Sequence, residues 1–170
     1  MKMHPLEIVC PECGGLAQFH EPFRFVRVRK FGSTSRRAHM WGRLAVEELF
    51  PKEFPWEQPS SDTPSFRYDP KEPGDGYLFN HRGMLECSKC RKIAPTKIIW
   101  PDSAYWRWIA EGELLVARNR DHANEIYEFL VGALRSPNRR PSLRHIPSVM
   151  LTNKVSSQLA KKILRDLVAS

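Results

Sequence analysis

A chain of 170 residues with 41% hydrophobic and 27% charged side chains is long enough to bury a core and too apolar to stay disordered, so we expect one globular domain over residues 1–170. It has no apolar run near the roughly 20 residues of a membrane-spanning helix, and its first residues lack the apolar core of a secretory signal. We therefore expect a cytoplasmic protein with no membrane partner.

The net charge of +8 is concentrated near the end of the chain. Residues 135–170 carry eight Lys or Arg against the single Asp166, whereas residues 51–76 carry three basic and six acidic residues. A basic segment beside an acidic, proline-rich one indicates a polyanion or a protein surface as partner.

The first segment contains a Cys-x-x-Cys pair in "IVCPECGGL", residues 8–16. Gly14 and Gly15 follow it and permit the positive φ that a tight turn around a metal tends to need. The next stretch, "FRFVRV" at residues 23–28, predicts a strand with Phe23 and Phe25 on a buried face. Its arginines cannot all share the other face, which predicts a bulge or an edge position.

Residues 31–76 are interpreted as an insertion between the two halves of the domain. The apolar spacing of "MWGRLAVEELF" predicts a short helix over residues 40–50, ended by Pro51. Residues 51–76 contain six prolines and predict an extended loop.

The second half reads mainly as hairpins. "GYLFNHRGMLEC" predicts a hairpin that leads into the second cysteine pair, "CSKC" at residues 87–90, and "TKIIW" at 96–100 predicts a strand. "AYWRWIA" and "ELLVAR" predict a hairpin around Glu111 and Gly112, with Trp106 and Trp108 on one face and both faces partly covered.

Two helices are predicted on either side of the basic connector "RSPNRRPSLRHIP". The first runs from Asp121, as N-cap, to about Leu134. The second runs from about residue 154 to 168 and should pack on the sheet through an apolar face, leaving a basic stripe in solvent. That apolar face comprises Val155, Leu159, Ala160, Ile163, Leu164, Leu167 and Val168, and the stripe comprises Lys154, Lys161, Lys162 and Arg165.

Of four interpretations of the cysteines, one uses all of them. The absence of a secretory signal disfavours disulfides, haem attachment needs His directly after the second Cys, and a redox dithiol leaves one pair unexplained. A tetrathiolate zinc site employs Cys10, Cys13, Cys87 and Cys90. Closing the 73-residue gap between the pairs costs about 4 kcal/mol. A structural zinc ion contributes roughly 10 to 16 kcal/mol, so one ion can close the loop.

The motifs "CPEC" and "CSKC", with the strand-like segments after them, resemble the zinc-ribbon class, in which two cysteine knuckles at the ends of β-hairpins share one ion. The resemblance implies one structural Zn²⁺ and no particular biology. The layout of the whole chain also resembles that of uncharacterised bacterial proteins with paired Cys-x-x-Cys motifs, which implies no activity. Together these features predict an α+β fold, with antiparallel hairpins around a two-knuckle ribbon, C-terminal helices and the proline-rich insertion.

Catalytic interpretations are weaker. The Asp121–His122 pair resembles the metal-and-base arrangement of HNH nucleases, but a helix cap and a surface histidine explain it more simply. A zinc deaminase needs a His-x-Glu or Cys-x-Glu motif and an open coordination position, and four thiolates leave none. We see neither a nucleophile elbow nor a phosphate-binding glycine loop. A non-catalytic protein is therefore expected, with no catalytic residues assigned.

Two binding functions remain open. The first is a nucleic-acid module, since Lys and Arg neutralise phosphates and aromatic rings can stack on bases. Its candidate residues are Arg36, Arg37, Arg135, Arg139, Arg140, Arg144, Lys161, Lys162 and Arg165. The second is a protein-interaction adaptor that uses aromatic anchors of the insertion. Those anchors are Phe54, Trp56, Phe66 and Tyr68.

Overall fold

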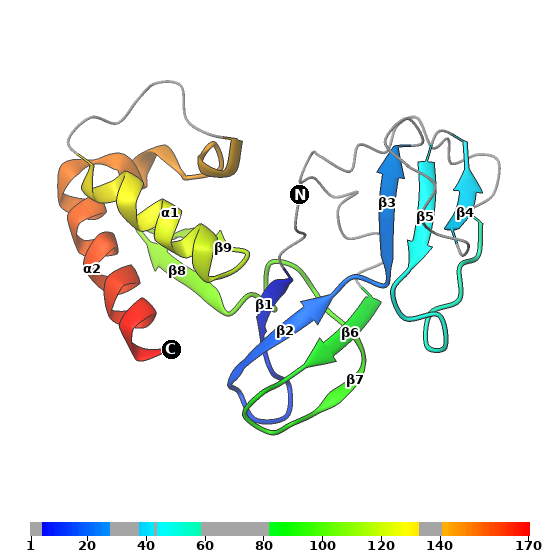
Figure 1. Ribbon diagram of the computed structural model, residues 1–170. Coiled ribbons are helices and arrows are strands. Elements are labelled where there is room, and N and C mark those ends of the chain that lie inside the picture. The colour runs from blue at the N-terminus through cyan, green and yellow to red at the C-terminus, as the bar shows by residue number, and fades with distance from the viewer. Residues whose placement is uncertain (1–4, 28–37, 43, 59–81, 133–140) are drawn as a thin grey trace. The chain divides into compact units, whose positions relative to one another are not determined.

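The computed structural model describes residues 5–27, 38–42, 44–58, 82–132 and 141–170. In these residues the fold is α+β, as predicted: antiparallel sheets are followed by two C-terminal α-helices (Figure 1). The chain forms two compact units, described separately below. Unit 1 comprises residues 1–18, 87–91 and 100–170, and unit 2 comprises residues 19–86 and 92–99. A single domain over residues 1–170, with an insertion at residues 31–76, stays a prediction.

A four-stranded sheet has the order β1-β2-β6-β7. The strands are β1 (Leu6–Val9), β2 (Leu16–His20), β6 (Arg82–Glu86) and β7 (Ile93–Lys97). The last two pair antiparallel, with Met84 opposite Pro95. Proline is tolerated there because β7 is an edge strand and needs no amide on its outer side. The strand was predicted at residues 96–100, but β7 spans Ile93–Lys97 and so lies earlier in the chain.

A second sheet has three strands in the order β3-β5-β4. They are β3 (Phe23–Arg27), β4 (Ala38–Trp41) and β5 (Leu44–Glu48). The segment "FRFVRV" was predicted to be a strand with a bulge or an edge position, and β3 lies at the edge of this sheet.

The helix predicted over residues 40–50 is wrong, because that stretch is a hairpin. Gly42 has φ of 59°, a turn conformation, and Trp41 pairs with Leu44 across it. Leu44, Ala45 and Val46 are all buried. A strand between two neighbours buries successive residues on both faces, and this imitates the apolar spacing of a helix.

The hairpin predicted around Glu111 and Gly112 is confirmed. The strands are β8 (Trp106–Ala110) and β9 (Glu113–Ala117), and the two turn residues have φ of 50° and 78°. Trp106 and Trp108 are only 1% and 5% exposed, so both belong to the core. The opposite face is less covered than predicted, since Ile109 is 58% exposed.

The first helix, α1, spans Arg120–Val131. Its N-cap is Asn119, whose side chain accepts a hydrogen bond from the backbone N–H of His122 at 2.9 Å. The prediction of Asp121 as N-cap is therefore wrong by two residues. Asn119 stands in the extended conformation that a cap requires, whereas Asp121 already lies inside the first turn. Its carboxylate still favours the positive end of the helix dipole there.

The final helix, α2 (Asn153–Ala169), begins and ends within one residue of the prediction. It follows two short 3₁₀ segments, Pro141–Leu143 and Ser148–Leu151, and packs against α1 and β8. Its buried residues are Val155, Ser156, Leu159, Ala160, Ile163 and Leu167. Leu164 and Val168, predicted as part of the apolar face, are 43% and 79% exposed because they lie at its margin.

The core of unit 1 joins the hairpin to both helices. Trp106, Trp108 and Leu115 pack with residues of α1 and α2 in one apolar cluster. The Trp108 indole also donates to the Asp166 carboxylate at 2.9 Å, which ties α2 to β8. The guanidinium of Arg120 donates to the backbone carbonyl of Leu167, so the first residue of α1 caps the last turn of α2.

The side chain of His122 fixes the connector to α1 and sets a pH dependence. Its Nδ1 accepts from the N–H of Arg118 at 3.2 Å, and its Nε2 bonds the carbonyl of Ser142 at 3.1 Å. This pattern requires the neutral ring, with its proton on Nε2. Burial lowers the pKa of His122 below its ordinary value, against opposing effects of the Ser142 carbonyl and Glu125.

Because the pKa of His122 is lower in the folded state, the unfolded chain binds more protons below about pH 6.5. The stabilisation is complete above that pH and is lost as pH falls towards the folded pKa. We expect the free energy of unfolding of the wild type, minus that of His122→Gln, to decrease between pH 7 and pH 5 in urea titrations. A difference independent of pH would contradict this account.

Candidate metal centre

The two cysteine pairs lie at the tips of two hairpins. Cys10 and Cys13 occupy the turn between β1 and β2, and Cys87 and Cys90 occupy the turn between β6 and β7. All four belong to unit 1. Among the described residues, these four cysteines form a group of side chains that could share one metal ion.

The four sulfur atoms lie close enough together to share one metal ion. All lie within 4.8 Å of one another, with Sγ–Sγ distances of 3.7 Å for Cys10–Cys90 and for Cys13–Cys87. A tetrahedron with metal–sulfur bonds of about 2.3 Å has edges of about 3.8 Å. The pairs across the two turns therefore stand at the separation that a metal ion demands, and far beyond the roughly 2 Å of a disulfide.

Both turns use the left-handed backbone conformation at the residue after the second cysteine. Gly14 has φ of 66° and Arg91, at the equivalent position, has φ of 60°. In the first turn, the N–H of Cys10 donates to the carbonyl of Gly15 at 2.8 Å, and the N–H of Gly14 donates to the carbonyl of Cys10 at 2.9 Å. These bonds fix the backbone that aims the first two sulfurs.

The predicted role of Gly15 needs correction. Gly14 alone of the two glycines has a positive φ. At Gly15, a Cβ atom would lie 2.8 Å from Cδ of Lys89 and 3.4 Å from Sγ of Cys13. Gly15 therefore provides space for a side chain of the opposite turn rather than conformational freedom.

The cysteines differ in exposure and ionisation. Cys10 and Cys87 are buried, Cys13 is half-buried and Cys90 is exposed. The pKa of Cys87 falls to about 7, chiefly because the backbone N–H of Cys90 points at its sulfur, while burial acts in the opposite direction. About half of the thiols with this pKa are ionised at neutral pH, and the thiolate is the form that binds a metal. Lys89 and Arg91 place positive charge beside the centre, where four thiolates and a divalent ion would leave a net charge of about −2.

Four of the basic residues proposed for phosphate binding are exposed: Arg144, Lys161, Lys162 and Arg165. The other five lie outside the described residues: Arg36, Arg37, Arg135, Arg139 and Arg140. The structure brings Lys161, Lys162 and Arg165 together on α2, and Lys154 is exposed on the same helix.

The predicted partner anchors have structural roles where they are described. Phe54 and Trp56 pack against the aromatic core of unit 2, formed by residues of β3, β4 and β5. The ring of Trp56 lies 5.0 Å from that of Phe23, and the Trp56 amide donates to the carboxylate of Glu48 at 2.6 Å. Phe66 and Tyr68 lie outside the described residues.

The Asp121–His122 pair has no nuclease-like arrangement. Both ring nitrogens of His122 bond backbone groups, at Arg118 and Ser142, so neither is directed to a metal ion or a water. The histidine was predicted at the surface, but it is half-buried and supports the connector.

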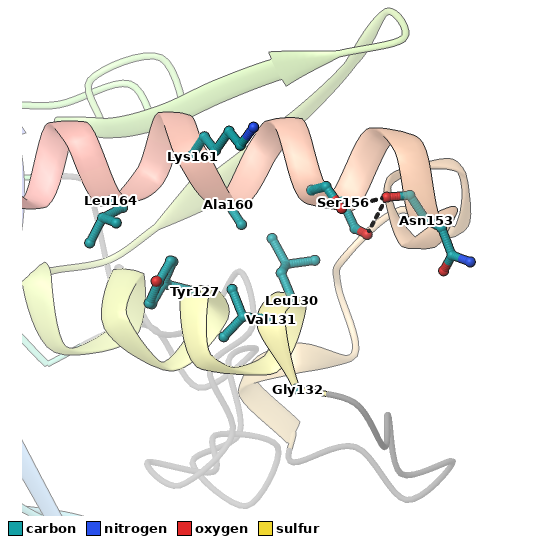
Figure 2. A pocket seen from close by; sticks show the side chains of 10 residues that line it. Tyr127, Leu130, Val131, Gly132, Asn153, Ser156, Ala160, Lys161 and Leu164 are labelled. Atoms are coloured by element: carbon teal, nitrogen blue, oxygen red, sulfur yellow. Dashed lines mark hydrogen bonds between the residues drawn. The ribbon is translucent and has the colours of Figure 1, made fainter.

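A groove of about 620 Å³ runs between α1 and α2. Figure 2 shows Tyr127, Leu130 and Val131 of α1 facing Ala160 and Leu164 of α2, and Lys161 of α2 also lines the groove. The groove therefore borders the basic side of α2 at Lys161.

No protein-family model, no curated protein and no solved structure matches the chain. Within the described residues, no helix is both long enough and apolar enough to cross a membrane.

Glu7, which no sequence pattern indicated, links the strand before Cys10 to the helices. The carboxylate of Glu7, three residues before Cys10, accepts from the Trp106 indole and from the N–H of Arg120 at 2.9 Å. Glu7 on a short amphipathic strand gives no signal of this role, because both partners lie about 100 residues further along the chain.

Removing one ligand should unfold unit 1. In Cys87→Ala, three thiolates hold the ion weakly and the two hairpin tips separate, so we expect bound metal to fall below one equivalent. The melting temperature should fall by roughly 10 °C or more, since several kcal/mol are lost. Elemental analysis measures the bound metal and thermal unfolding measures the melting temperature. A Cys87→Ala variant with an unchanged melting temperature would contradict a structural role of the metal.

The backbone conformation of Gly14 predicts a more selective effect. A Cβ at this position meets no atom within 4 Å, so Gly14→Ala introduces backbone strain of about 1 to 2 kcal/mol without a clash. We expect metal affinity to decrease about tenfold. Gly112→Ala is the matched control, since Gly112 also has a positive φ and open space but lies in the β8–β9 turn. The control should lower stability and leave metal affinity unchanged; equal effects on affinity would contradict the prediction.

Proposed function

We propose that this chain is a zinc-stabilised, non-catalytic nucleic-acid-binding module. Zn²⁺ is the ion that best suits the centre, because it accepts four thiolates in a tetrahedron without a redox requirement. Four thiolates also complete its coordination, which leaves no position to activate a water molecule. The role proposed for the ion is therefore structural, and the binding function is assigned to another surface.

The observation that carries the nucleic-acid proposal is the one-sided charge of α2. Its solvent face presents Lys154, Lys161 and Lys162, all exposed. The one carboxylate of the helix, Asp166, bonds the Trp108 indole, at the edge of the buried face. A helix face that carries positive charges without interspersed carboxylates suits a polyanionic partner better than a face of mixed charge does.

The remaining cations support the same surface less strongly. Arg165 is exposed but pairs with Asp166, its Nε lying 3.0 Å from the carboxylate oxygen, so part of its charge is already compensated. Arg144 is exposed in the connector that precedes α2. Arg135, Arg139 and Arg140 would add to the same segment.

A protein-interaction adaptor is the weaker alternative. It depended on free aromatic anchors in the insertion, and Phe54 and Trp56 are engaged with the core of unit 2. Phe66 and Tyr68 remain as its candidate anchors.

The identity of the metal is tested by elemental analysis of protein produced without added metal. We expect one zinc per chain and no iron, since both ions accept four thiolates but only iron would give a coloured, redox-active centre. One equivalent of iron would overturn the assignment to zinc.

Nucleic-acid binding is tested by fluorescence anisotropy with labelled oligonucleotides, single-stranded and duplex, from low to physiological salt. We expect an affinity that falls steeply with salt concentration. In the double variant Lys161→Ala/Lys162→Ala, the slope of log K against the logarithm of the salt concentration should be smaller in magnitude by about 2. The matched control is Lys52→Ala/Lys97→Ala, which removes two exposed lysines of unit 2. Absence of binding, or equal loss in both variants, would contradict the proposal.

A further inference from the structure

Unit 1 offers phosphate-binding charge without a surface for base stacking. It contains six aromatic residues of the Phe, Tyr and Trp types, and all six are described: Trp100, Tyr105, Trp106, Trp108, Tyr127 and Phe129. None is exposed, since Trp106 and Trp108 are buried and the others are half-buried. Proteins that hold single strands place exposed rings beside their cations. The unit that carries α2 lacks this feature.

The cations on α2 are arranged along one face of a helix that is long enough to lie in a DNA groove. Lys154 and Lys161 are separated by two helical turns, a rise of about 10 Å. The major groove of B-form DNA is about 12 Å wide and admits an α-helix. A helix in this groove lies along it, so side chains on the two flanks of its inward face reach phosphates on opposite strands. At 3.6 residues per turn, Lys154 and Lys161 lie on one flank of the basic face and Lys162 lies on the other.

The side chains between these lysines are compatible with a close approach. Gln158 lies one turn after Lys154 and one turn before Lys162, so it occupies the middle of the basic face, and it is exposed. Glutamine can donate to and accept from base edges in a groove without adding charge. Lys161 lines the groove between α1 and α2 and so marks the edge of the basic face nearest α1, whereas Lys154, Gln158 and Lys162 do not line that groove.

From these observations we infer that α2 binds duplex DNA in the major groove, with Lys154 and Lys161 contacting one strand, Lys162 contacting the other, and Gln158 facing the base edges. This inference rests on the proposed nucleic-acid function and specifies its substrate as B-form duplex rather than single strands. An RNA duplex is not expected to fit, because its major groove is deep and narrow.

The inference is tested by competition. A labelled 20-base-pair DNA duplex is bound to the zinc-loaded full chain, and three unlabelled competitors of the same sequence are added: duplex DNA, single-stranded DNA and duplex RNA. We expect duplex DNA to compete at least tenfold better than either of the others at equal salt. Methyl green, which occupies the major groove, should displace the protein, whereas netropsin, which occupies the minor groove, should not.

Two variants locate the contact on α2. Gln158→Glu places a carboxylate in the centre of the face and should weaken duplex binding at least tenfold, while Gln158→Ala should weaken it less than threefold. Because position 158 is exposed, both variants should melt like the wild type.

The outcomes separate this inference from the function on which it rests. Equal or tighter binding of single strands or of duplex RNA, displacement by netropsin instead of methyl green, or an unchanged Gln158→Glu variant would overturn the major-groove assignment and leave a nucleic-acid module. Failure of every nucleic acid to bind would overturn both.

Discussion

The structure of unit 1 depends on bringing four sulfur atoms, from two turns separated by 73 residues, to within 4.8 Å of one another. Four thiolates at this separation repel one another unless a cation lies between them. Closing the intervening loop costs about 4 kcal/mol, which is small beside the roughly 10 to 16 kcal/mol of a structural zinc site. A metal ion is therefore the simplest means of holding the tips together, and it places no demand on the segment that joins them.

The effect of the centre reaches the helices through β1. Cys10 directly follows this strand, in which Glu7 bonds Trp106 of β8 and the first amide of α1. Arg120, the residue that provides this amide, in turn caps the last turn of α2 with its guanidinium. A continuous set of hydrogen bonds thus runs from the strand beside the thiolates to the helix that carries the basic face. Loss of metal should loosen that helix even though no ligand belongs to it.

Local chemistry made several elements predictable from the sequence. The Glu111–Gly112 turn, the placement of Trp106 and Trp108 on one face and the bounds of α2 follow from turn residues and periodicity. The cluster of four cysteines was recognisable because a shared metal ion requires paired thiolates at this short spacing. The errors arose where tertiary context decided the outcome. Burial on both faces gave the β4–β5 hairpin the pattern of a helix, a cap two residues earlier replaced Asp121, and the contacts of Glu7 depend on residues distant in sequence.

The central claim is that Cys10, Cys13, Cys87 and Cys90 bind one zinc ion as thiolates. X-ray absorption at the zinc edge, on protein purified without added metal, tests it most directly because it reports the type, number and distance of the ligands. The account predicts four sulfur atoms at about 2.3 Å and no nitrogen or oxygen ligand. A mixed ligand set, fewer than four sulfurs, or no zinc in folded protein would contradict it.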